Sequence, residues 1–354
     1  MNDEFLSQFK SLKTFVILFG SLFVFVIVLN IIQPIFQIFL MLFYGVLVAV
    51  LFSGLGFLVK SKINVSYRSA VTIAILALFV LSLLGGWFMG RQAIKEFSEM
   101  IKKLPKAEQT IHEELKKHEW GKSLLHLSSE RKKIFSLRGG MLKNLTGLFS
   151  ETLGQAISVA IILVIGIYMS LTPKLYLKGA IKLIPMKKRE KARETFNAIG
   201  RALRLWLVGR FITMLGVGLL TGVGFFIAGM PNTLSLALLA GLLSFVPFLG
   251  PIAAAVPAVL VAVFHNVYLL IPVGIIFVIV HMFEGYIVTP LIQQRTVDLP
   301  PVVLIMAQIL VGLFLGISGI LIATPLTITV IVIIQKAYIE GFLGDSVKVL
   351  GEKA

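Results

Sequence analysis

The feature that most constrains this chain is a long stretch without formal charge. No Asp, Glu, Lys or Arg occurs between Arg210 and Glu284. One helical crossing of a bilayer core takes about 20 apolar residues, so this stretch has room for about three crossings. A soluble domain with so much apolar side chain would expose large apolar patches to water. The stretch therefore predicts an integral membrane protein.

The overall composition supports a membrane protein and excludes several functional classes. Of 354 residues, 57% are hydrophobic and 14% are charged, whereas a soluble domain has about 25% charged residues. The net charge of +16 lies mostly between apolar runs, where it can set topology and bind anionic headgroups, so we expect no nucleic-acid partner. The absence of cysteine excludes disulfides, thiol nucleophiles and cysteine metal sites. We expect no cofactor and no metal.

Five further apolar runs are long enough to contain a membrane crossing. They cover residues 14–32, 34–59, 69–90, 152–173 and 299–335. Together with the stretch after Arg210, they predict about eight transmembrane segments. Barrel strands would need alternating segments of about ten residues, and these runs are apolar throughout, so helices are expected. The predicted fold class is an all-α integral membrane protein, with 14–32 as a retained first span because no A-x-A cleavage site follows it.

The charged regions divide the chain into six expected parts. Residues 1–90 form three N-terminal transmembrane helices, 91–150 an extracytoplasmic helical domain, 151–173 a fourth transmembrane helix, 174–210 a basic cytoplasmic amphipathic segment, 211–335 a C-terminal transport core, and 336–354 a cytoplasmic tail. The loop at 60–68 and the segment at 174–210 are rich in Lys and Arg, and short loops of this kind stay in the cytoplasm. With eight segments, we expect both termini in the cytoplasm.

The basic segment at 174–210 contains only two acidic residues, Glu190 and Glu194. We interpret it as an amphipathic helix that lies on an anionic membrane leaflet. The residues expected to contact lipid headgroups are Lys187, Lys188, Arg189 and Arg193. The alternative interpretation is a cytoplasmic linker with a solvated charged face.

Two apolar segments in the second half are too long and too irregular for one simple crossing. Residues 232–265 would form a single helix of about 50 Å, and residues 299–335 form a run of similar length. Proline removes a backbone donor and clashes with the preceding turn, so continuous helices are not expected here. The interrupting residues are Pro247, Gly250, Pro251 and Pro257 in the first segment, and Gly312, Gly316, Gly319 and Pro325 in the second.

Broken helices or re-entrant hairpins are the first interpretation of these two segments. Backbone groups that are freed inside a membrane must face protein or a wet cavity, and transporters build substrate and ion sites in this way. We therefore expect a site where residues 246–257 meet residues 315–325. The alternative is two tilted, proline-kinked spans that pack through small residues.

A few polar side chains in apolar surroundings are candidates for a transport path. His281 and Glu284 are three residues apart and share a helix face. An intramembrane carboxylate is a functional candidate that could carry protons or bind a cation. Alternatively, Glu284 lies at a membrane end and pairs with Arg295 or with water. Gln308 and Thr324 either line a cavity or satisfy neighbouring backbone groups.

An enzymatic function is not expected. Gly316, Ser318 and Gly319 match the Gly-x-Ser-Gly pattern of rhomboid proteases, but those enzymes need a His from a later helix and none follows Ser318. The sequence also lacks a His-Glu-x-x-His zinc motif and a P-loop. ATP-driven transport by this chain alone is therefore unsupported.

Three further motifs lie in the second half of the chain. They are Gly-Leu-Leu-Ser-Phe-Val-Pro-Phe-Leu-Gly-Pro from Gly241, Glu-Gly-Tyr-Ile-Val-Thr-Pro from Glu284, and Ala-Thr-Pro from Ala323. Together they resemble the signature of the AI-2E family of transporters. The resemblance implies a bacterial or archaeal permease of the cytoplasmic membrane that forms a homo-oligomer. Some family members are described as exporters of autoinducer-2, and others as sodium–proton antiporters. Leu299 stands where many relatives carry a basic or His residue before the proline, so the resemblance does not fix the substrate.

Three functions remain as expectations from the sequence. The first is a secondary transporter that moves a small polar solute by alternating access around broken membrane helices. The second is a Na⁺/H⁺-type antiporter in which Glu284 titrates. The third is a membrane scaffold that does not transport and whose residues 91–150 bind an envelope partner. The expected partners are membrane lipids and a small polar solute, monovalent cation or proton.

Overall fold

The computed structural model describes residues 36–87, 95, 152–288 and 300–345. These residues are almost entirely helical, and no strand occurs among them. Five of their helices are long and apolar enough to cross a membrane, or six if one bent pair counts as a single span. The all-α membrane fold is thereby confirmed. The expected span at 14–32 and nearly all of the expected domain at 91–150 lie outside the described residues, so the total of eight segments stays a prediction.

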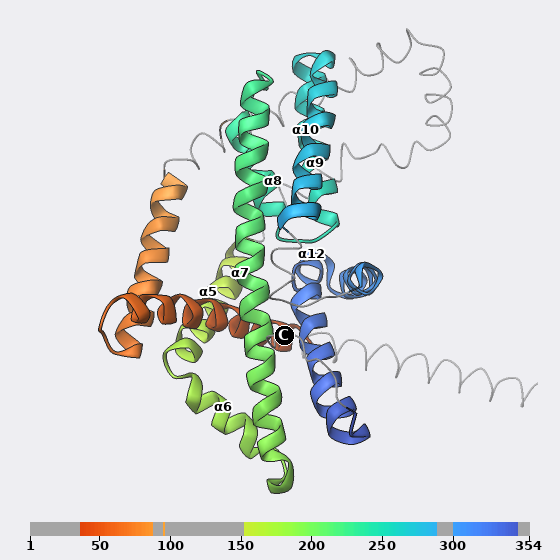
Figure 1. Ribbon diagram of the computed structural model, residues 1–354. Coiled ribbons are helices and arrows are strands. Elements are labelled where there is room, and N and C mark those ends of the chain that lie inside the picture. The colour runs from red at the N-terminus through yellow and green to blue at the C-terminus, as the bar shows by residue number, and fades with distance from the viewer. Residues whose placement is uncertain (1–35, 88–94, 96–151, 289–299, 346–354) are drawn as a thin grey trace, which may run out of the picture.

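The first two described helices, Phe36–Lys62 and Tyr67–Trp87, correspond to the expected spans at 34–59 and 69–90. The Ser66 side chain begins the second helix by accepting a hydrogen bond from the Ser69 amide at 3.2 Å. A Cβ atom on Gly56 would overlap the Val71 side chain, so this glycine lets the two helices touch. Figure 1 shows that they meet at a steep angle (red and orange).

Helix α5 (Thr152–Leu171) crosses the Phe36–Lys62 helix at a pair of glycines. A Cβ atom on Gly45 would overlap Ile165, and one on Gly166 would overlap Val48. The following helix, α6 (Pro173–Lys182), is bent by 92° from α5. Proline has no amide hydrogen to continue a helix and suits the first position of a new one. The bend thus lies at the end of the apolar run at 152–173.

Helix α7 (Arg189–Ile227) is the long axis of the molecule (Figure 1). Its 39 residues span about 58 Å at 1.5 Å per residue. It follows the 3₁₀ turn η1 (Met186–Lys188) and contacts α8, α10 and α12. At its end Gly229 adopts a positive φ of 66°, which is the usual glycine closure of a helix. The boundary expected at residue 210 lies inside this continuous helix.

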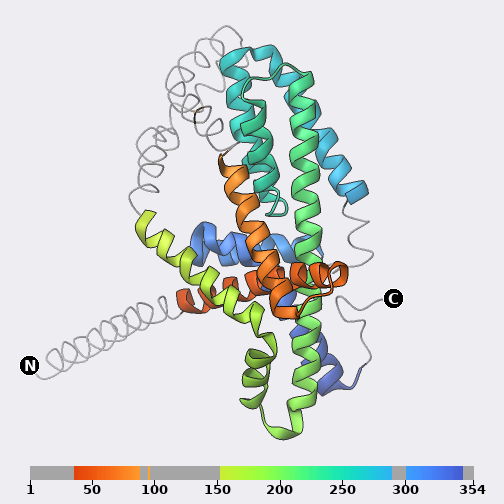
Figure 2. The same cartoon turned by 90° about the vertical axis from the view of Figure 1, so that its left-hand side faces the viewer.

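The segment at 232–265 forms two helices, α8 (Thr233–Leu243) and α9 (Leu249–His265). Figure 2 shows them folded back on each other beside α7. The interruption lies at residues 244–248, which we call the α8–α9 break. Pro257 lies inside α9, so the interruption expected at this proline is absent.

Helix α10 follows the short 3₁₀ turn η2 and continues directly into the π-helix η3. Their bounds are Val267–Leu269 for η2, Leu270–Phe283 for α10 and Glu284–Val288 for η3. An apolar core joins α10 to its neighbours through Phe225 of α7, Leu236 of α8, Ala262 of α9 and Val273 of α10. This packing holds the first part of α10 against the end of α7.

Helix α12 (Pro301–Ile333) contains a non-helical residue, Gly316, with φ 62° and ψ −145°. A Cβ atom on Gly319 would overlap the Val311 carbonyl, and one on Gly312 would lie 2.7 Å from Ile320. Residues before and after Gly316 therefore lie side by side, and the chain doubles back at this kink. Pro325 lies within the second half without breaking it, so the interruption expected there is also absent. The chain continues into the π-helix η4 (Ile334–Leu343).

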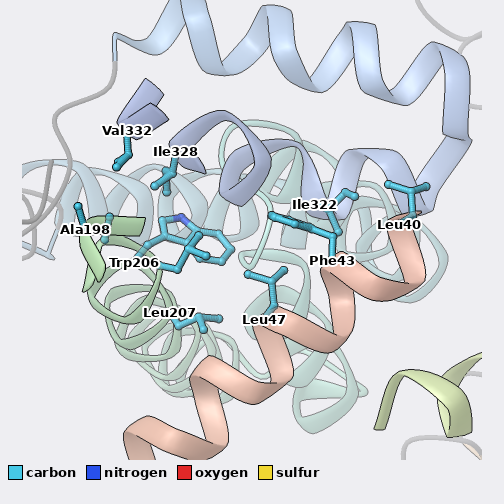
Figure 3. Packing of buried hydrophobic residues seen from close by; sticks show 11 residues of the cluster. Leu40, Phe43, Leu47, Ala198, Trp206, Leu207, Ile322, Ile328 and Val332 are labelled. Atoms are coloured by element: carbon cyan, nitrogen blue, oxygen red, sulfur yellow. The ribbon is translucent and has the colours of Figure 1, made fainter. Parts of the chain in front are cut away.

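The second half of α12 is fixed in an apolar core against α7 and the Phe36–Lys62 helix (Figure 3). Phe43 and Leu47 come from the first helix, Leu207 from α7, and Ile322 from α12. Burial of one such side chain contributes about 1.5 to 3 kcal/mol. Trp206 of the same core packs edge-on against Phe245 at a centroid distance of 5.4 Å. The core thus reaches the α8–α9 break.

Candidate functional site

A charged cluster lies where the α8–α9 break meets α7, α10 and α12. Arg210 comes from the middle of α7, and His281 and Glu284 come from the end of α10 and the start of η3. The first half of α12 supplies Gln308. Each side chain has a contact to the break or to another member, so we treat these residues as one site and call it the Arg210 cluster.

The α8–α9 break has an unusual backbone conformation. Phe248 has a positive φ of 63°, which is strained for a residue with a bulky side chain. A Cβ atom on Gly250 would overlap the carbonyl oxygen of Leu243, so only glycine fits this turn. The Leu249 and Gly250 amides donate to Pro247 and Val246 at 2.7 and 3.1 Å. The first two amides of α9 are therefore paired with backbone carbonyls of the break.

Two carbonyl groups of the break accept hydrogen bonds from side chains of other helices. The Ser244 carbonyl accepts from Nη1 of Arg210 at 3.4 Å, and the Pro247 carbonyl accepts from Nε2 of Gln308 at 2.9 Å. Buried backbone groups need such partners because an unpaired one is costly. Because the helix is interrupted here, these carbonyl groups are available to accept hydrogen bonds from α7 and α12.

Arg210 and Glu284 form an ion pair deep inside the apolar part of the protein. Nη1 of Arg210 lies 3.6 Å from Oε1 of Glu284, and the two side chains are only 15% and 17% exposed. Charges at such a position are expensive unless they are paired. Sequence reasoning missed Arg210 as a member of the site and named Arg295, which lies outside the described residues, as a partner for Glu284. The sequence did contain a signal for this pair, because Arg210 and Glu284 are the charged residues at the two ends of the uncharged stretch.

His281 contacts the other oxygen of the same carboxylate. Its Nδ1 lies 3.0 Å from Oε2 of Glu284, as expected for residues three apart on a helix. The imidazole ring also packs against Phe277 at a centroid distance of 5.7 Å. Its Nε2 atom is buried and has no hydrogen-bond partner among the described residues. His281 therefore holds Glu284 on one side while Arg210 approaches it from the other.

Gln308 links α12 to the break and keeps one unused polar atom. Its side chain is 1% exposed, and Nε2 donates to Pro247 as described. Its Oε1 atom is buried without a partner in the described part of the chain. An unpaired buried acceptor costs about 1 to 3 kcal/mol. The cluster therefore contains both a positive charge and a free acceptor.

The structure brings some of the predicted path residues together and leaves others apart. Pro247, His281, Glu284 and Gln308 belong to the break or to the Arg210 cluster, and Gly250 lies beside the break in the first turn of α9. Among the described residues, no hydrogen bond or ion pair connects the remaining candidates to Arg210; these are Pro251, Pro257, Gly316, Gly319, Thr324 and Pro325. Thr324 is buried in α12, and its Oγ1 has no hydrogen-bond partner among the described residues.

The residues predicted to contact lipid headgroups lie on η1 and at the start of α7. Lys187 and Lys188 are exposed on η1. Arg189 instead donates from Nε to the Ile184 carbonyl at 3.0 Å and closes the turn between α6 and α7. Arg193 lies 3.8 Å from Glu190. Lipid contact at this end therefore stays a prediction, and the two lysines have the freer side chains.

The carboxylate and imidazole of the cluster stand beside a positive charge. Within the ranges that the structure describes, no three His, Asp or Glu side chains gather closely enough to hold a metal ion. A cation at the cluster would be attracted by the Glu284 carboxylate and repelled by the Arg210 guanidinium group. The groups of the cluster can bind a polar ligand, exchange one ion-pair partner for another, and transfer a proton.

Comparison with known proteins points to transport. The sequence model of the family described as AI-2E family transporter matches residues 15–339. Three proteins that each bear the name "Putative transport protein" are similar to the chain. YrrI of Bacillus subtilis (strain 168) is 25% identical over 266 residues, which are 72% of this chain and 75% of that protein.

The other two relatives match over somewhat shorter regions. YueF of Bacillus subtilis (strain 168) is 24% identical, and the match covers 61% of this chain and 61% of that protein. YhhT of Escherichia coli (strain K12) is 27% identical, and the match covers 65% of this chain and 66% of that protein.

Proposed function

Because the chain belongs to the AI-2E transporter family, we propose that it moves a small polar solute across the cytoplasmic membrane of a prokaryote through the Arg210 cluster. It is a multi-pass helical membrane protein whose relatives bear the name "Putative transport protein". In this function the Arg210 cluster lies on the solute path, both termini are in the cytoplasm, and the α8–α9 break opens to the two sides of the membrane in turn.

One observation carries the proposal. A charge pair, Arg210 with Glu284, lies beside a break in a membrane-buried helical segment. An apolar pair of similar size would usually stabilise a fold as well or better, so a packing role alone gives little reason for charges there. Polar groups at a helix break inside a membrane are the arrangement by which transporters bind solutes. The same observation disfavours a scaffold that does not transport.

The contacts around the cluster support alternating access. Apart from the packing of Phe245 on Trp206, the break is attached to α7 and α12 by single hydrogen bonds, from Arg210 and from Gln308. Farther from the break, α8 is locked to α7 at Gly241, where a Cβ atom would lie 2.8 Å from the Met214 carbonyl. Solute groups can replace the single hydrogen bonds, whereas the close backbone contact must persist. The break is therefore the part of the core that we expect to change contacts during a transport cycle.

The distribution of charge supports an orientation with both termini in the cytoplasm. The basic residues of η1 and early α7 lie at one end, and the turn at 228–232 at the other end of α7 carries no charge. Basic loops favour the cytoplasmic side. Lys191 donates to the Glu340 carbonyl at 3.4 Å, so η4 lies at the same basic end. The C-terminal part of the chain would then be cytoplasmic.

Na⁺/H⁺-type antiport is a second candidate because Glu284 lies between a cation and an imidazole. In that function the carboxylate would have to release Arg210 each time it takes up a proton or a cation. The Arg210 charge disfavours a bound cation at the same place. We therefore rank antiport below transport of a polar solute.

Flux into proteoliposomes tests both candidates. Purified protein is reconstituted with an internal pH-sensitive dye, a sodium gradient is imposed, and the wild type is compared with Glu284→Gln. A matched control is Glu190→Gln, which removes an exposed carboxylate. We expect no sodium-dependent proton movement in any of the three proteins. Sodium-dependent proton movement that is lost only in Glu284→Gln would establish antiport and overturn the ranking.

Solute transport itself is tested by counterflow. Proteoliposomes are loaded with a panel of small polar metabolites, and uptake of a labelled trace of each is followed. Accelerated uptake of at least one solute, lost in Arg210→Ala and kept in Glu190→Gln, supports the proposal. Uptake of no solute by well-inserted protein, or uptake that Arg210→Ala leaves unchanged, would contradict it.

A further inference from the structure

We propose that Arg210 binds an oxyanion group of the solute, a carboxylate or a phosphate, and that Glu284 occupies this place when the site is empty. The inference rests on the proposed function and adds the chemical class of the solute. It assigns opposite roles to the two charges, since Arg210 binds the ligand and Glu284 competes with it.

The first argument is the unused binding capacity of Arg210. An arginine side chain has five N–H donors in a planar fork that matches a carboxylate or phosphate. Both polar contacts of Arg210 within the described residues use Nη1 alone. The side chain is 15% exposed, so a small ligand can approach without unfolding the surrounding helices. Nε and Nη2 are therefore the donors that we assign to the incoming anion.

The second argument is the length of the ion pair. The distance from Arg210 to Glu284 is 3.6 Å, whereas a close hydrogen bond between oppositely charged groups measures about 2.7 to 2.9 Å. The same carboxylate lies closer to His281, at 3.0 Å. Glu284 is thus held mainly by its helix neighbour and only loosely by Arg210. When a solute oxyanion takes the place of the Glu284 carboxylate beside Arg210, a weak contact is lost and a bidentate contact is formed.

The third argument excludes the opposite charge. A cation would need oxygen ligands, and the Ser244 and Pro247 carbonyls of the break already accept hydrogen bonds from Arg210 and Gln308. No Lys or Arg other than Arg210 lies in the stretch from Arg210 to Glu284, so Arg210 is the fixed positive charge of this stretch. A cation at the break would meet that charge at short range. An anion would instead be attracted to it.

Two further atoms fit the rest of such a solute. Oε1 of Gln308 and Nε2 of His281 are buried and lack partners among the described residues. A hydroxyl or amine group can donate to the first, and a hydroxyl group can exchange a hydrogen bond with the second. We therefore expect a solute that carries hydroxyl or amine groups in addition to its oxyanion.

Anion-dependent thermal stabilisation tests the inference without knowledge of the natural solute. The purified full chain in detergent is heated in sodium chloride, sodium acetate or sodium phosphate at equal ionic strength and pH. We expect acetate or phosphate to raise the unfolding temperature of the wild type above its value in chloride. Glu284→Gln should bind the same anion about tenfold more tightly, because a competing charge pair of about 1.4 kcal/mol is removed. Weaker or unchanged anion binding in Glu284→Gln would overturn the inference.

Two variants guard against a purely structural effect. Arg210→Gln combined with Glu284→Gln removes both charges together and should fold but lose the anion response. Arg204→Gln, which removes an exposed arginine from the same helix, should keep it. An anion response that survives in the double variant would assign it to another site and overturn the inference. Counterflow of a neutral polar solute without any anion response would do the same, while the proposed transport function would stand.

Discussion

The two interruptions of membrane-buried helices in this protein are built differently. The α8–α9 break is held by side chains with charge or amide groups, Arg210 and Gln308, which hydrogen-bond its carbonyls. The kink at Gly316 is held by close backbone packing of Gly319, and its main polar contact comes from the hydroxyl of Tyr44, which donates to the Ser318 carbonyl at 2.6 Å. The break is a polar structure, and the kink is mainly a steric one.

This difference assigns different roles to two segments that look alike in the sequence. A break whose carbonyls are satisfied by removable side chains can exchange them for solute groups. A kink that depends on the absence of side chains positions the two halves of α12 and presents Gln308 to the break. We therefore expect the break to be sensitive to charge and the kink to be sensitive to size.

The largest expected effect is at Gly250. Gly250→Ala places a Cβ atom against the Leu243 carbonyl, and backbone cannot move away as a flexible side chain can. We expect destabilisation of about 3 kcal/mol, measured by thermal unfolding in detergent. The control is Gly274→Ala, because a Cβ atom at Gly274 meets nothing within 4 Å. Equal stability of the two variants would contradict the described geometry of the break.

A slightly smaller loss is expected when the ion pair is broken. Arg210→Met leaves Glu284 with only His281 as a partner in a mostly buried position. Removal of one partner of a fully buried pair costs about 3 to 5 kcal/mol, and partial exposure lowers this to about 2 kcal/mol. The double variant with Glu284→Gln should recover most of the stability. A double variant less stable than Arg210→Met would show that the two charges do not interact.

At the kink, Gly316→Ala should be destabilising by about 1 to 2 kcal/mol, because the residue has φ 62° and ψ −145°, a region that is essentially restricted to glycine. The anion response in the thermal assay should be retained, since the polar contacts of Arg210 in the described part of the chain go to Ser244 and Glu284 and not to Gly316. Loss of the anion response at unchanged stability would mean that the kink, and not only the break, belongs to the binding site.

The smallest expected effect is at Tyr44. Tyr44→Phe removes one hydroxyl that donates to the Ser318 carbonyl, and a single hydrogen bond of this kind contributes about 1 kcal/mol. Unfolding temperature should fall slightly, and counterflow should change less than in any variant of the Arg210 cluster. A complete loss of transport in Tyr44→Phe would make the kink the central element.

The sequence predicted the helices and part of the site for clear physical reasons. Uncharged runs of sufficient length gave the Phe36–Lys62 and Tyr67–Trp87 helices nearly to their ends, because a bilayer sets the minimum length. The contact between His281 and Glu284 follows from helical spacing. The position of the break near Pro247 follows from proline and glycine chemistry.

The parts that could not be predicted depend on tertiary contacts. The partner of Glu284 is Arg210 on a different helix, and no local pattern connects two residues so far apart. Pro257 and Pro325 stay inside helices, since neighbouring helices can satisfy the backbone groups that a proline frees. The doubling back of α12 depends on the positive φ of one glycine among several, and the sequence does not distinguish Gly316 from the others.

The central claim, that the α8–α9 break opens to each side of the membrane in turn, is tested most directly by thiol labelling. The chain has no cysteine, so Ser244→Cys introduces a single thiol at a position that is 1% exposed. A membrane-impermeant maleimide is applied to each side of the membrane in turn. The control is Lys187→Cys, which places the thiol at an exposed position. We predict that Ser244→Cys reacts slowly from both sides and that Lys187→Cys reacts from one side only. Reaction of Ser244→Cys from neither side, or from one side alone, would contradict alternating access at the break.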